Sequence, residues 1–190
     1  AENYWYRADC YAEMNNYDNA VLDYSQAINV SPEDPEMYNQ RGIFYHNVGK
    51  YDLALEDYNE VLKLDPDYMW AFNNIAMIYT DQGDFDLAIK TYTQAIDLDP
   101  EDPLAYRNRA LSYIEMGEYE KAIADYTDAI KLAQDNEELA ENYWYRALCY
   151  AEMNNYDNAV LDYSQAINVS PEDPEMYNER GMFYYNVGKY

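Results

Sequence analysis

The sequence lacks the residues on which most catalytic and nucleic-acid-binding sites depend. It contains a single histidine, His46, so no triad or proton relay that needs a second imidazole can form. Twelve lysines and arginines stand against 37 aspartates and glutamates, which gives a formal net charge of −25. Because phosphate backbones are bound by basic patches, this composition argues against nucleic acid as a partner.

Glycine clusters, calcium loops and long apolar runs are also missing. The six glycines never gather into a phosphate-binding loop. The acidic run at 97–102 has neither the glycine nor the distal glutamate of a calcium-binding loop. No segment reads as a transmembrane helix or as a signal peptide. We therefore expect no metal, no cofactor, no enzymatic activity and no membrane insertion.

What the chain has instead is an internal repeat. Residues 1–34 return at 140–173 with one substitution, Asp9 to Leu148, and looser copies fill the space between them. This period divides the chain into five repeats and a half repeat. Repeats 1 to 5 cover residues 1–34, 35–68, 69–102, 103–136 and 140–173, and the half repeat covers 174–190.

Three extra residues before repeat 5 create a seam at 133–139, which we interpret as the joint between two copies of a four-repeat block. The proline that ends the other repeats is replaced by Gln134, so the preceding helix is expected to continue to about Ala133–Gln134. Asp135 and Glu138 are spaced as a capping box, which predicts an early start for the next helix.

Aromatic and small residues mark two faces in each repeat. Aromatic residues recur at positions 4, 11 and 24, and small residues recur at positions 8, 20 and 27. Positions 4, 8 and 11, like positions 20, 24 and 27, are spaced i, i+4, i+7, which is typical of one face of an α-helix. Each repeat is therefore predicted to form two antiparallel helices, helix A at about positions 1–14 and helix B at about 18–31. Glycine at position 15 and proline at position 32 end these helices in most repeats.

These landmarks resemble those of the tetratricopeptide repeat (TPR) family, whose 34-residue unit is a helix–turn–helix. The resemblance covers the whole chain except the three-residue insertion. The chain departs from the family in having tyrosine or phenylalanine where tryptophan is usual at position 4, and mostly arginine where leucine is usual at position 7. The resemblance implies an all-α fold, a right-handed superhelical α-solenoid of antiparallel helix pairs that forms a single domain over 1–190.

The family resemblance also implies a ligand-binding groove lined by helix A positions 2, 5, 6, 9, 12 and 13. A partial row of asparagines at these positions could bond the backbone of an extended peptide. An apolar stripe beside the row is typical of an interaction surface, unless neighbouring helices cover part of it. Arg107 is the only cation here, which disfavours a clamp for a C-terminal carboxylate. The groove set is Trp5, Asn39, Ile43, His46, Trp70, Asn73, Asn74, Met77, Arg107, Asn108, Leu111, Trp144, Leu148, Met182 and Tyr185.

The near-duplicate segments 1–51 and 140–190 differ at four positions, and all four belong to the implied groove. The differences are Asp9/Leu148, Gln40/Glu179, Ile43/Met182 and His46/Tyr185. We interpret them as a difference in what the two grooves contact. Partner contacts are expected to concentrate on the second copy, at Leu111, Trp144, Leu148, Met182 and Tyr185.

Arginine at position 7 and aspartate at position 23 are present together or absent together. Repeat 3 alone has Ile75 and Thr91 at these positions. Because the two residues are lost together, pairing within a repeat is favoured over pairing between neighbours. The predicted structural ion pairs are Arg7–Asp23, Arg41–Asp57, Arg109–Asp125 and Arg146–Asp162.

Two functions remain open at this point. The first is a protein-interaction scaffold that binds a peptide or partner segment in the groove. The alternative is a structural module that self-associates through the half repeat, where Phe183, Tyr184 and Val187 are expected to lack cover. Cys10 and Cys149 occupy equivalent positions four repeats apart, on the order of 40 Å, so no intramolecular disulfide is expected. A cytoplasmic location is expected, and the chain resembles a fragment of a longer one.

Overall fold

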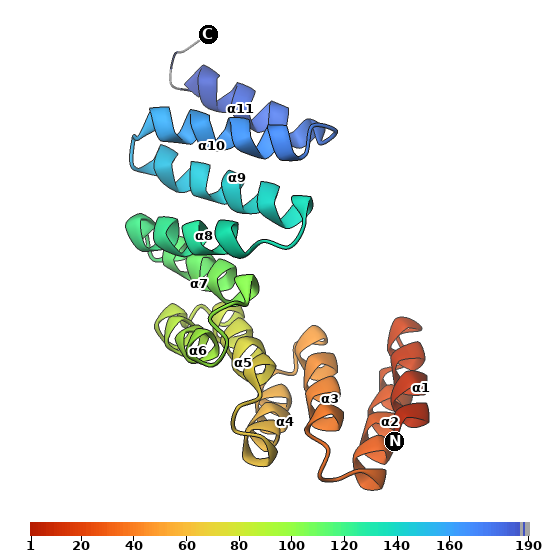
Figure 1. Ribbon diagram of the computed structural model, residues 1–190. Helices are drawn as coiled ribbons and strands as arrows, with labels where there is room; N and C mark the ends of the chain where they lie inside the picture. The colour runs from red at the N-terminus through yellow and green to blue at the C-terminus, as the bar shows by residue number, and fades with distance from the viewer. Residues whose placement is uncertain (187, 189–190) are drawn as a thin grey trace. The chain divides into compact units, whose positions relative to one another are not determined.

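The computed structural model describes residues 1–186 and 188, and of Asn186 only the backbone. Over these residues the chain forms eleven α-helices and no strand (Figure 1). This confirms the predicted all-α solenoid of helix pairs. The helices are α1 (Glu2–Glu13), α2 (Tyr17–Val30), α3 (Pro35–Asn47), α4 (Tyr51–Leu64), α5 (Met69–Asp81), α6 (Phe85–Leu98), α7 (Pro103–Glu115), α8 (Tyr119–Leu132), α9 (Asn136–Glu152), α10 (Tyr156–Val169) and α11 (Pro174–Asn186).

The helices divide into two compact units, Ala1–Asp84 and Phe85–Tyr190, called here the N-terminal and C-terminal units. In the N-terminal unit, α1 packs against α2 and α3 against α4. In the C-terminal unit, α7 packs against α8 and α9 against α10, and α11 rests on α10 (Figure 1). Each unit is described by itself below.

Each of the five turns from helix A to helix B contains one residue in the left-handed region. Gly49, Gly83 and Gly117 have φ between 71° and 78°, where a side chain would be strained. Asn15 and Asn154 occupy the same position with φ of 56° and 58°. Asparagine tolerates this conformation better than other non-glycine residues, so the turn survives without glycine in repeats 1 and 5.

The seam before repeat 5 differs from the prediction in one respect and agrees in another. Helix α8 ends at Leu132, so the predicted continuation to Ala133–Gln134 is wrong. Ala133 adopts φ −52° and ψ 131°, which is an extended conformation. The early start of the next helix is confirmed, because Asp135 caps α9 by accepting from the Glu138 N–H at 2.8 Å. Glu138 Oε2 in turn accepts from the Gln134 N–H at 3.1 Å, a variant of the capping box.

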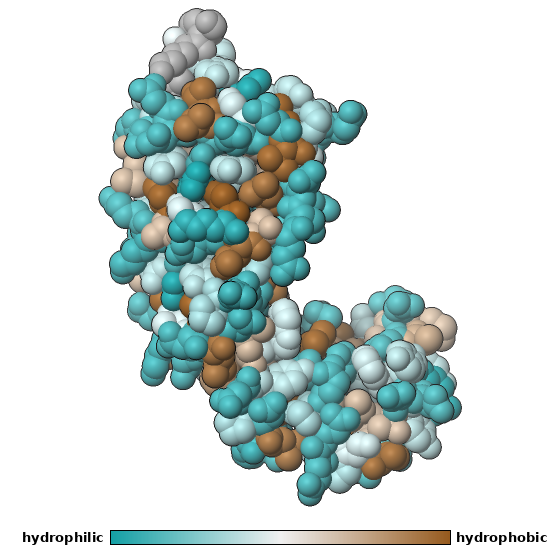
Figure 2. Space-filling model, in the orientation of Figure 1, coloured by the Kyte–Doolittle hydropathy of each residue, from teal (hydrophilic) through white to brown (hydrophobic). Residues whose placement is uncertain are grey.

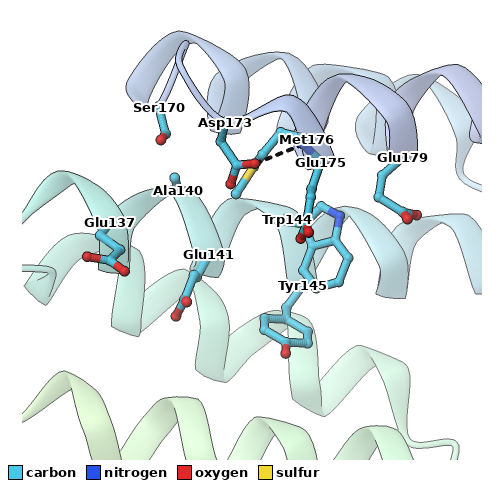
Figure 3. A pocket seen from close by; sticks show the side chains of 10 residues that line it. All are labelled: Glu137, Ala140, Glu141, Trp144, Tyr145, Ser170, Asp173, Glu175, Met176 and Glu179. Atoms are coloured by element: carbon cyan, nitrogen blue, oxygen red, sulfur yellow. Dashed lines mark hydrogen bonds between the residues drawn. The ribbon is translucent and has the colours of Figure 1, made fainter.

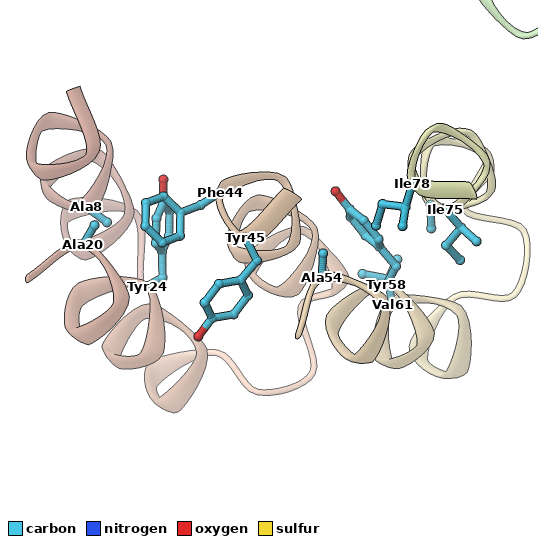
Figure 4. Packing of buried hydrophobic residues seen from close by; sticks show 11 residues of the cluster. Ala8, Ala20, Tyr24, Phe44, Tyr45, Ala54, Tyr58, Val61, Ile75 and Ile78 are labelled. Carbon is cyan, nitrogen blue, oxygen red and sulfur yellow. The ribbon is translucent and has the colours of Figure 1, made fainter. Parts of the chain in front are cut away.

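The core alternates alanines with tyrosines. In the N-terminal unit, Ala8, Ala20 and Ala54 let helix backbones approach closely, and Tyr24 and Tyr58 fill the space that remains (Figure 4). Equivalent alanines surround Tyr126 and Tyr163 in the C-terminal unit. The interior is therefore semi-polar, since each tyrosine carries a hydroxyl into the core.

Hydrophilic side chains dominate the surface. On the face drawn in Figure 2 they predominate, and the apolar side chains lie in patches between them. In the described part of the chain, no helix is both long enough and apolar enough to cross a bilayer.

Candidate functional site

All the predicted groove residues lie on the A helices, and they fall into both units. In the N-terminal unit they lie on α1, α3 and α5, and in the C-terminal unit on α7, α9 and α11. Those of the C-terminal unit are Arg107, Asn108, Leu111, Trp144, Leu148, Met182 and Tyr185, which include all five positions where contacts were expected to concentrate.

The amide row of the N-terminal unit is not an open surface. Asn39 and Asn73 are only 5% and 1% exposed. Asn39 Oδ1 accepts a hydrogen bond from Asn74 Nδ2 at 3.1 Å, which joins α3 to α5. The expectation that these amides face a ligand must therefore be corrected for Asn39 and Asn73. Asn39 lies between adjacent A helices and Asn73 is buried, which periodicity alone could not predict.

His46 also joins two repeats. Its Nε2 lies 2.8 Å from Asp81 Oδ2 at the end of α5, and its side chain is mostly buried. Trp70 and Met77, on α5 in the same unit, are 48% and 37% exposed. These two side chains are therefore the most accessible apolar members of the groove set in the N-terminal unit.

In the C-terminal unit, Met182 and Tyr185 on α11 are 45% and 72% exposed. Trp144 and Leu148 on α9 are half-buried and pack against the cluster around Tyr163. Phe183 belongs to the same cluster and is only 8% exposed, with its ring centroid 5.3 Å from that of Tyr163.

The expectation that the half repeat lacks cover is therefore wrong for Phe183, because α10 covers it. Tyr184 is partly buried against the same cluster. Val187, for which the same was expected, lies outside the described residues. The exposed apolar surface of α11 consists instead of Met182 and Tyr185, together with Tyr177.

A cavity of about 270 Å³ opens between α9 and the start of α11, and we call it the acidic cavity (Figure 3). Five carboxylates and the aromatic rings of two neighbouring residues of α9 surround it, and the N-cap Asp173 accepts from the Glu175 N–H at 2.8 Å. Sequence reasoning missed most of this site, although Trp144 and Glu179 had been singled out. The lining residues are Glu137, Ala140, Glu141, Trp144, Tyr145, Ser170, Asp173, Glu175, Met176 and Glu179.

The N-terminal unit contains a counterpart of this cavity. Seven of its lining residues correspond to lining residues of the acidic cavity when 139 is added to their numbers. There Glu36 accepts hydrogen bonds from Gln40 Nε2 and from the Tyr68 hydroxyl. Its counterpart Glu175 has Glu179 in place of that glutamine. The N-terminal counterpart is lined by Ala1, Glu2, Asn3, Trp5, Ser31, Asp34, Glu36 and Met37.

Each arginine of the four expected ion pairs contacts the aspartate of its own repeat. Arg41, Arg109 and Arg146 bind Asp57, Asp125 and Asp162 through two nitrogens at 2.7 to 2.9 Å. Arg7 and Asp23 make the same fork, with a shortest distance of 2.5 Å. In repeat 3, Thr91 instead donates to the Leu87 carbonyl oxygen within α6.

The arginines also reach the preceding repeat, which the sequence analysis overlooked. Arg41 donates to Ser25 Oγ at 3.0 Å, Arg109 to Thr93 Oγ1 at 2.9 Å and Arg146 to Thr127 Oγ1 at 3.0 Å. A signal was available, because serine or threonine at position 25 precedes each such arginine, whereas Asn59 precedes Ile75. Each of these three arginines therefore ties three helices together.

The pKa values of Asp23 and Asp125 shift in opposite directions. The hydrogen bond from the exposed Arg7 lowers the pKa of Asp23. Burial raises the pKa of Asp125, and the opposing effect of Arg109 does not overcome it. The pairs join the two helices of each repeat that carries them.

The two cysteines have different surroundings. Burial raises the pKa of the Cys149 thiol to about 12, which keeps it protonated. Cys10 is exposed, and both cysteines are free. Among the described residues, no group of three or more histidine, cysteine, aspartate or glutamate side chains is arranged to hold a metal ion.

Comparisons with known proteins identify the repeat and the fold. Models described as TPR repeat match residues 8–49, 76–117 and 147–188. Models described as tetratricopeptide repeat match 35–68 and 103–136, and also 57–90. No curated protein matches the chain.

Several solved structures are similar over nearly the whole chain. MamA 41-end from Desulfovibrio magneticus RS-1 is 19% identical with a TM-score of 0.75, covering 91% of this chain and 96% of that chain. TTC0263, a thermophilic TPR protein in Thermus thermophilus, is 20% identical with a TM-score of 0.71, covering 97% and 98%. At these identities the similarity shows the fold alone.

Proposed function

Because the chain belongs to the tetratricopeptide repeat family, we propose that it binds a peptide or partner segment in the groove of its A helices and has no enzymatic activity. The TPR fold supports a protein-interaction scaffold in general. The location of binding in the groove, and the residues that line it, are what we propose beyond this general function.

The observation that carries the proposal is the exposure of large apolar side chains at groove positions in each unit. Trp70 and Met77 are solvent-accessible on α5 of the N-terminal unit. Met182 and Tyr185 are solvent-accessible on α11 of the C-terminal unit. Apolar surface that remains exposed on a folded domain tends to mark an interaction site. A segment with apolar side chains would cover these residues.

The test uses the natural difference between the two copies. Leu148→Asp restores the residue of the first copy, where Asp9 Oδ1 accepts from the Tyr24 hydroxyl at 2.5 Å, so the second copy can accommodate it beside Tyr163. Peptides selected from a library against the intact chain are expected to bind the variant more weakly by about 1–3 kcal/mol. Leu161→Asp, at an exposed leucine of α10, is the matched control.

Calorimetry on both variants measures the effect. Equal weakening of peptide binding by Leu148→Asp and Leu161→Asp would indicate that an added negative charge weakens binding wherever it is placed. The loss would then not come from a groove contact. Failure of any peptide to bind the parent chain would remove the proposal altogether.

Self-association is the second candidate, and the exposed side chains of α11 favour it. Tyr177, Met182 and Tyr185 provide apolar surface that a second copy of this chain could cover. Light scattering over a range of concentrations tests it without any peptide. A strict monomer at high concentration would leave the groove as the remaining candidate.

A further inference from the structure

We propose that Asp9 makes the groove of the N-terminal unit selective for a basic side chain of the partner segment. The inference rests on the proposed function, because it requires that a partner segment covers this groove. It goes further in naming the residue that decides which side chain the groove accepts at one position.

Asp9 lies in a cavity of about 460 Å³ between α1, α2 and α3, which we call the groove cavity. Asp9 and Glu13 contribute carboxylates from successive turns of α1, and most of the other side chains around the cavity are apolar or aromatic. The lining residues are Asp9, Ala12, Glu13, Tyr17, Tyr24, Gln40, Ile43, Phe44, Asn47 and Val48. The cavity therefore combines an apolar wall with a charged end.

Asp9 interrupts a stripe that is apolar in every other repeat. The residues at the same position of the later repeats are Ile43, Met77, Leu111, Leu148 and Met182. Asp9 Oδ1 accepts a hydrogen bond from the Tyr24 hydroxyl at 2.5 Å. The core does not depend on this bond, because Tyr163 packs beside Leu148 in repeat 5 and is buried to the same degree, 3% exposed against 4% for Tyr24. A structural role therefore does not account for the carboxylate.

The two copies of the sequence differ mainly around this cavity. Segments 1–51 and 140–190 differ at four positions, and three of them line the groove cavity. These three differences are Asp9/Leu148, Gln40/Glu179 and Ile43/Met182. The other lining residues are identical in the sequence of the second copy. Substitutions that gather around one cavity and spare its framework are expected where two similar sites discriminate between partners.

Covering the groove places a requirement on the partner. Asp9 is already half-buried, and no described lysine or arginine pairs with it. A segment laid over the cavity removes water from this carboxylate, and a desolvated carboxylate without a counter-charge is strongly unfavourable. A neutral donor such as a serine hydroxyl would supply a hydrogen bond and leave the charge uncompensated. The segment must therefore bring a cation to Asp9.

A lysine or arginine side chain matches the cavity in shape as well as in charge. Its methylene stem can lie along Ile43, Phe44 and Val48 while its charged end reaches Asp9. Glu13 provides a second acceptor for the several N–H donors of such a group. An inorganic cation would neutralise Asp9 and leave the apolar wall uncovered.

The experiment selects peptides from a phage-displayed library of random dodecapeptides on the intact chain and on three variants. Asp9→Leu is the first test variant, because leucine occupies the same position in repeat 5. Asp9→Asn is the second, since its amide oxygen remains an acceptor for the Tyr24 hydroxyl and only the charge is removed. Glu56→Leu is the matched control. It also removes one negative charge from a helix of the N-terminal unit, outside the cavity and at a position where repeat 1 has the exposed Leu22.

We expect lysine and arginine to be enriched among peptides selected on the parent and on Glu56→Leu, and to lose this enrichment on both Asp9 variants. In calorimetry, replacing the enriched basic residue of a parent-selected peptide by norleucine should weaken binding to the parent by about tenfold, as for the loss of one charge-assisted contact. The same replacement should change binding to Asp9→Leu by less than about twofold, because the two changes remove the same contact. Thermal melts of the variants establish that the fold is intact.

Other results would overturn the assignment. Equal loss of basic residues on Glu56→Leu would mean that the overall charge of −25 attracts basic peptides without Asp9. Basic residues that persist on Asp9→Leu, or parent-selected peptides without a basic residue, would also reject the inference. If such peptides still respond to Leu148→Asp, the proposed function stands without it. Failure of every peptide to bind the parent would reject both.

Discussion

At the scale of single residues, Gly42 and Gly181 occupy equivalent positions in nearly identical sequences but different surroundings. A Cβ atom added at Gly42 would lie 2.6 Å from Tyr58 Cε1, and that ring is fully buried. No described atom lies within 4 Å of a Cβ added at Gly181. The same substitution should therefore have opposite effects at the two sites.

We predict that Gly42→Ala destabilises the chain and that Gly181→Ala does not. Overpacking costs about 1–3 kcal/mol and outweighs the helix-propensity gain of about 0.5–1 kcal/mol at Gly42. At Gly181 only the gain of about 0.5–1 kcal/mol remains. Urea denaturation at equal m-values measures both, and a stabilised Gly42→Ala variant would contradict the packing described for Tyr58.

Contacts of some single residues could be predicted from the sequence, whereas the burial of others could not. The joint loss of arginine and aspartate in repeat 3 pointed to pairing within a repeat, because co-occurrence along the sequence reports a shared interaction. The burial of Asn39 and Asn73 was not visible in the same way. Helical periodicity gives the face on which a residue lies, and the depth at which a neighbouring helix covers that face depends on packing between repeats.

At the scale of the helices, boundaries followed the local signals. Glycine at position 15 and proline at position 32 act through backbone geometry, so their effect does not depend on the rest of the fold. The seam lacks the proline, and there the predicted end of α8 was wrong while the capping box of α9 was right. The acidic cavity was not predicted as a unit, because its lining comes from two helices and the loop between α10 and α11.

The arginine fork joins neighbouring helices, and repeat 3 lacks both of its residues. Arg41 is mostly buried and bonds Asp57 and Ser25. Burial works against the charge of Arg41, but its hydrogen bonds to Asp57 and the charge of that residue raise its pKa. Repeat 3 has Ile75 and Thr91 at these positions, and both are buried.

We predict that Asp57→Ala costs about 3–5 kcal/mol, because it leaves the guanidinium largely buried without its carboxylate. The double variant Arg41→Ile/Asp57→Thr copies repeat 3 and should recover most of that loss. A double-mutant cycle, with each stability measured by urea denaturation, gives the coupling free energy between Arg41 and Asp57. If the double variant is less stable than Asp57→Ala alone, the ion pair contributes more than apolar packing can replace.

At the scale of the whole molecule, tyrosine and acidic charge set the response to pH. The chain has 25 tyrosines, and several are fully buried in the two units. Burial raises the pKa of Tyr58 and Tyr126, and burial together with the nearby Glu179 raises the pKa of Tyr163 to about 12. For Tyr24, burial acts together with the hydrogen bond to Asp9 to raise the pKa. The fold therefore favours the neutral phenol at these positions.

A tyrosine in the unfolded chain titrates near pH ~10. Because the folded-state pKa values are higher, their contribution to stability is complete below about pH 10 and is lost as the pH rises through the folded-state values. We predict that helix content measured by circular dichroism is retained up to about pH 10 and is lost between that pH and about pH 12 or above, together with the appearance of tyrosinate absorbance from the core.

Tyr126→Phe provides the discriminating variant. The Tyr126 hydroxyl is buried, and no described residue forms a hydrogen bond with it, so its removal leaves no partner unpaired. The variant should unfold at a higher pH than the parent, because one group that must ionise in the core has gone. Tyr6→Phe, at an exposed ring, should leave the midpoint unchanged. An identical midpoint in all three proteins would assign alkaline unfolding to general charge repulsion, which grows with the chain's net charge, and not to the tyrosine core.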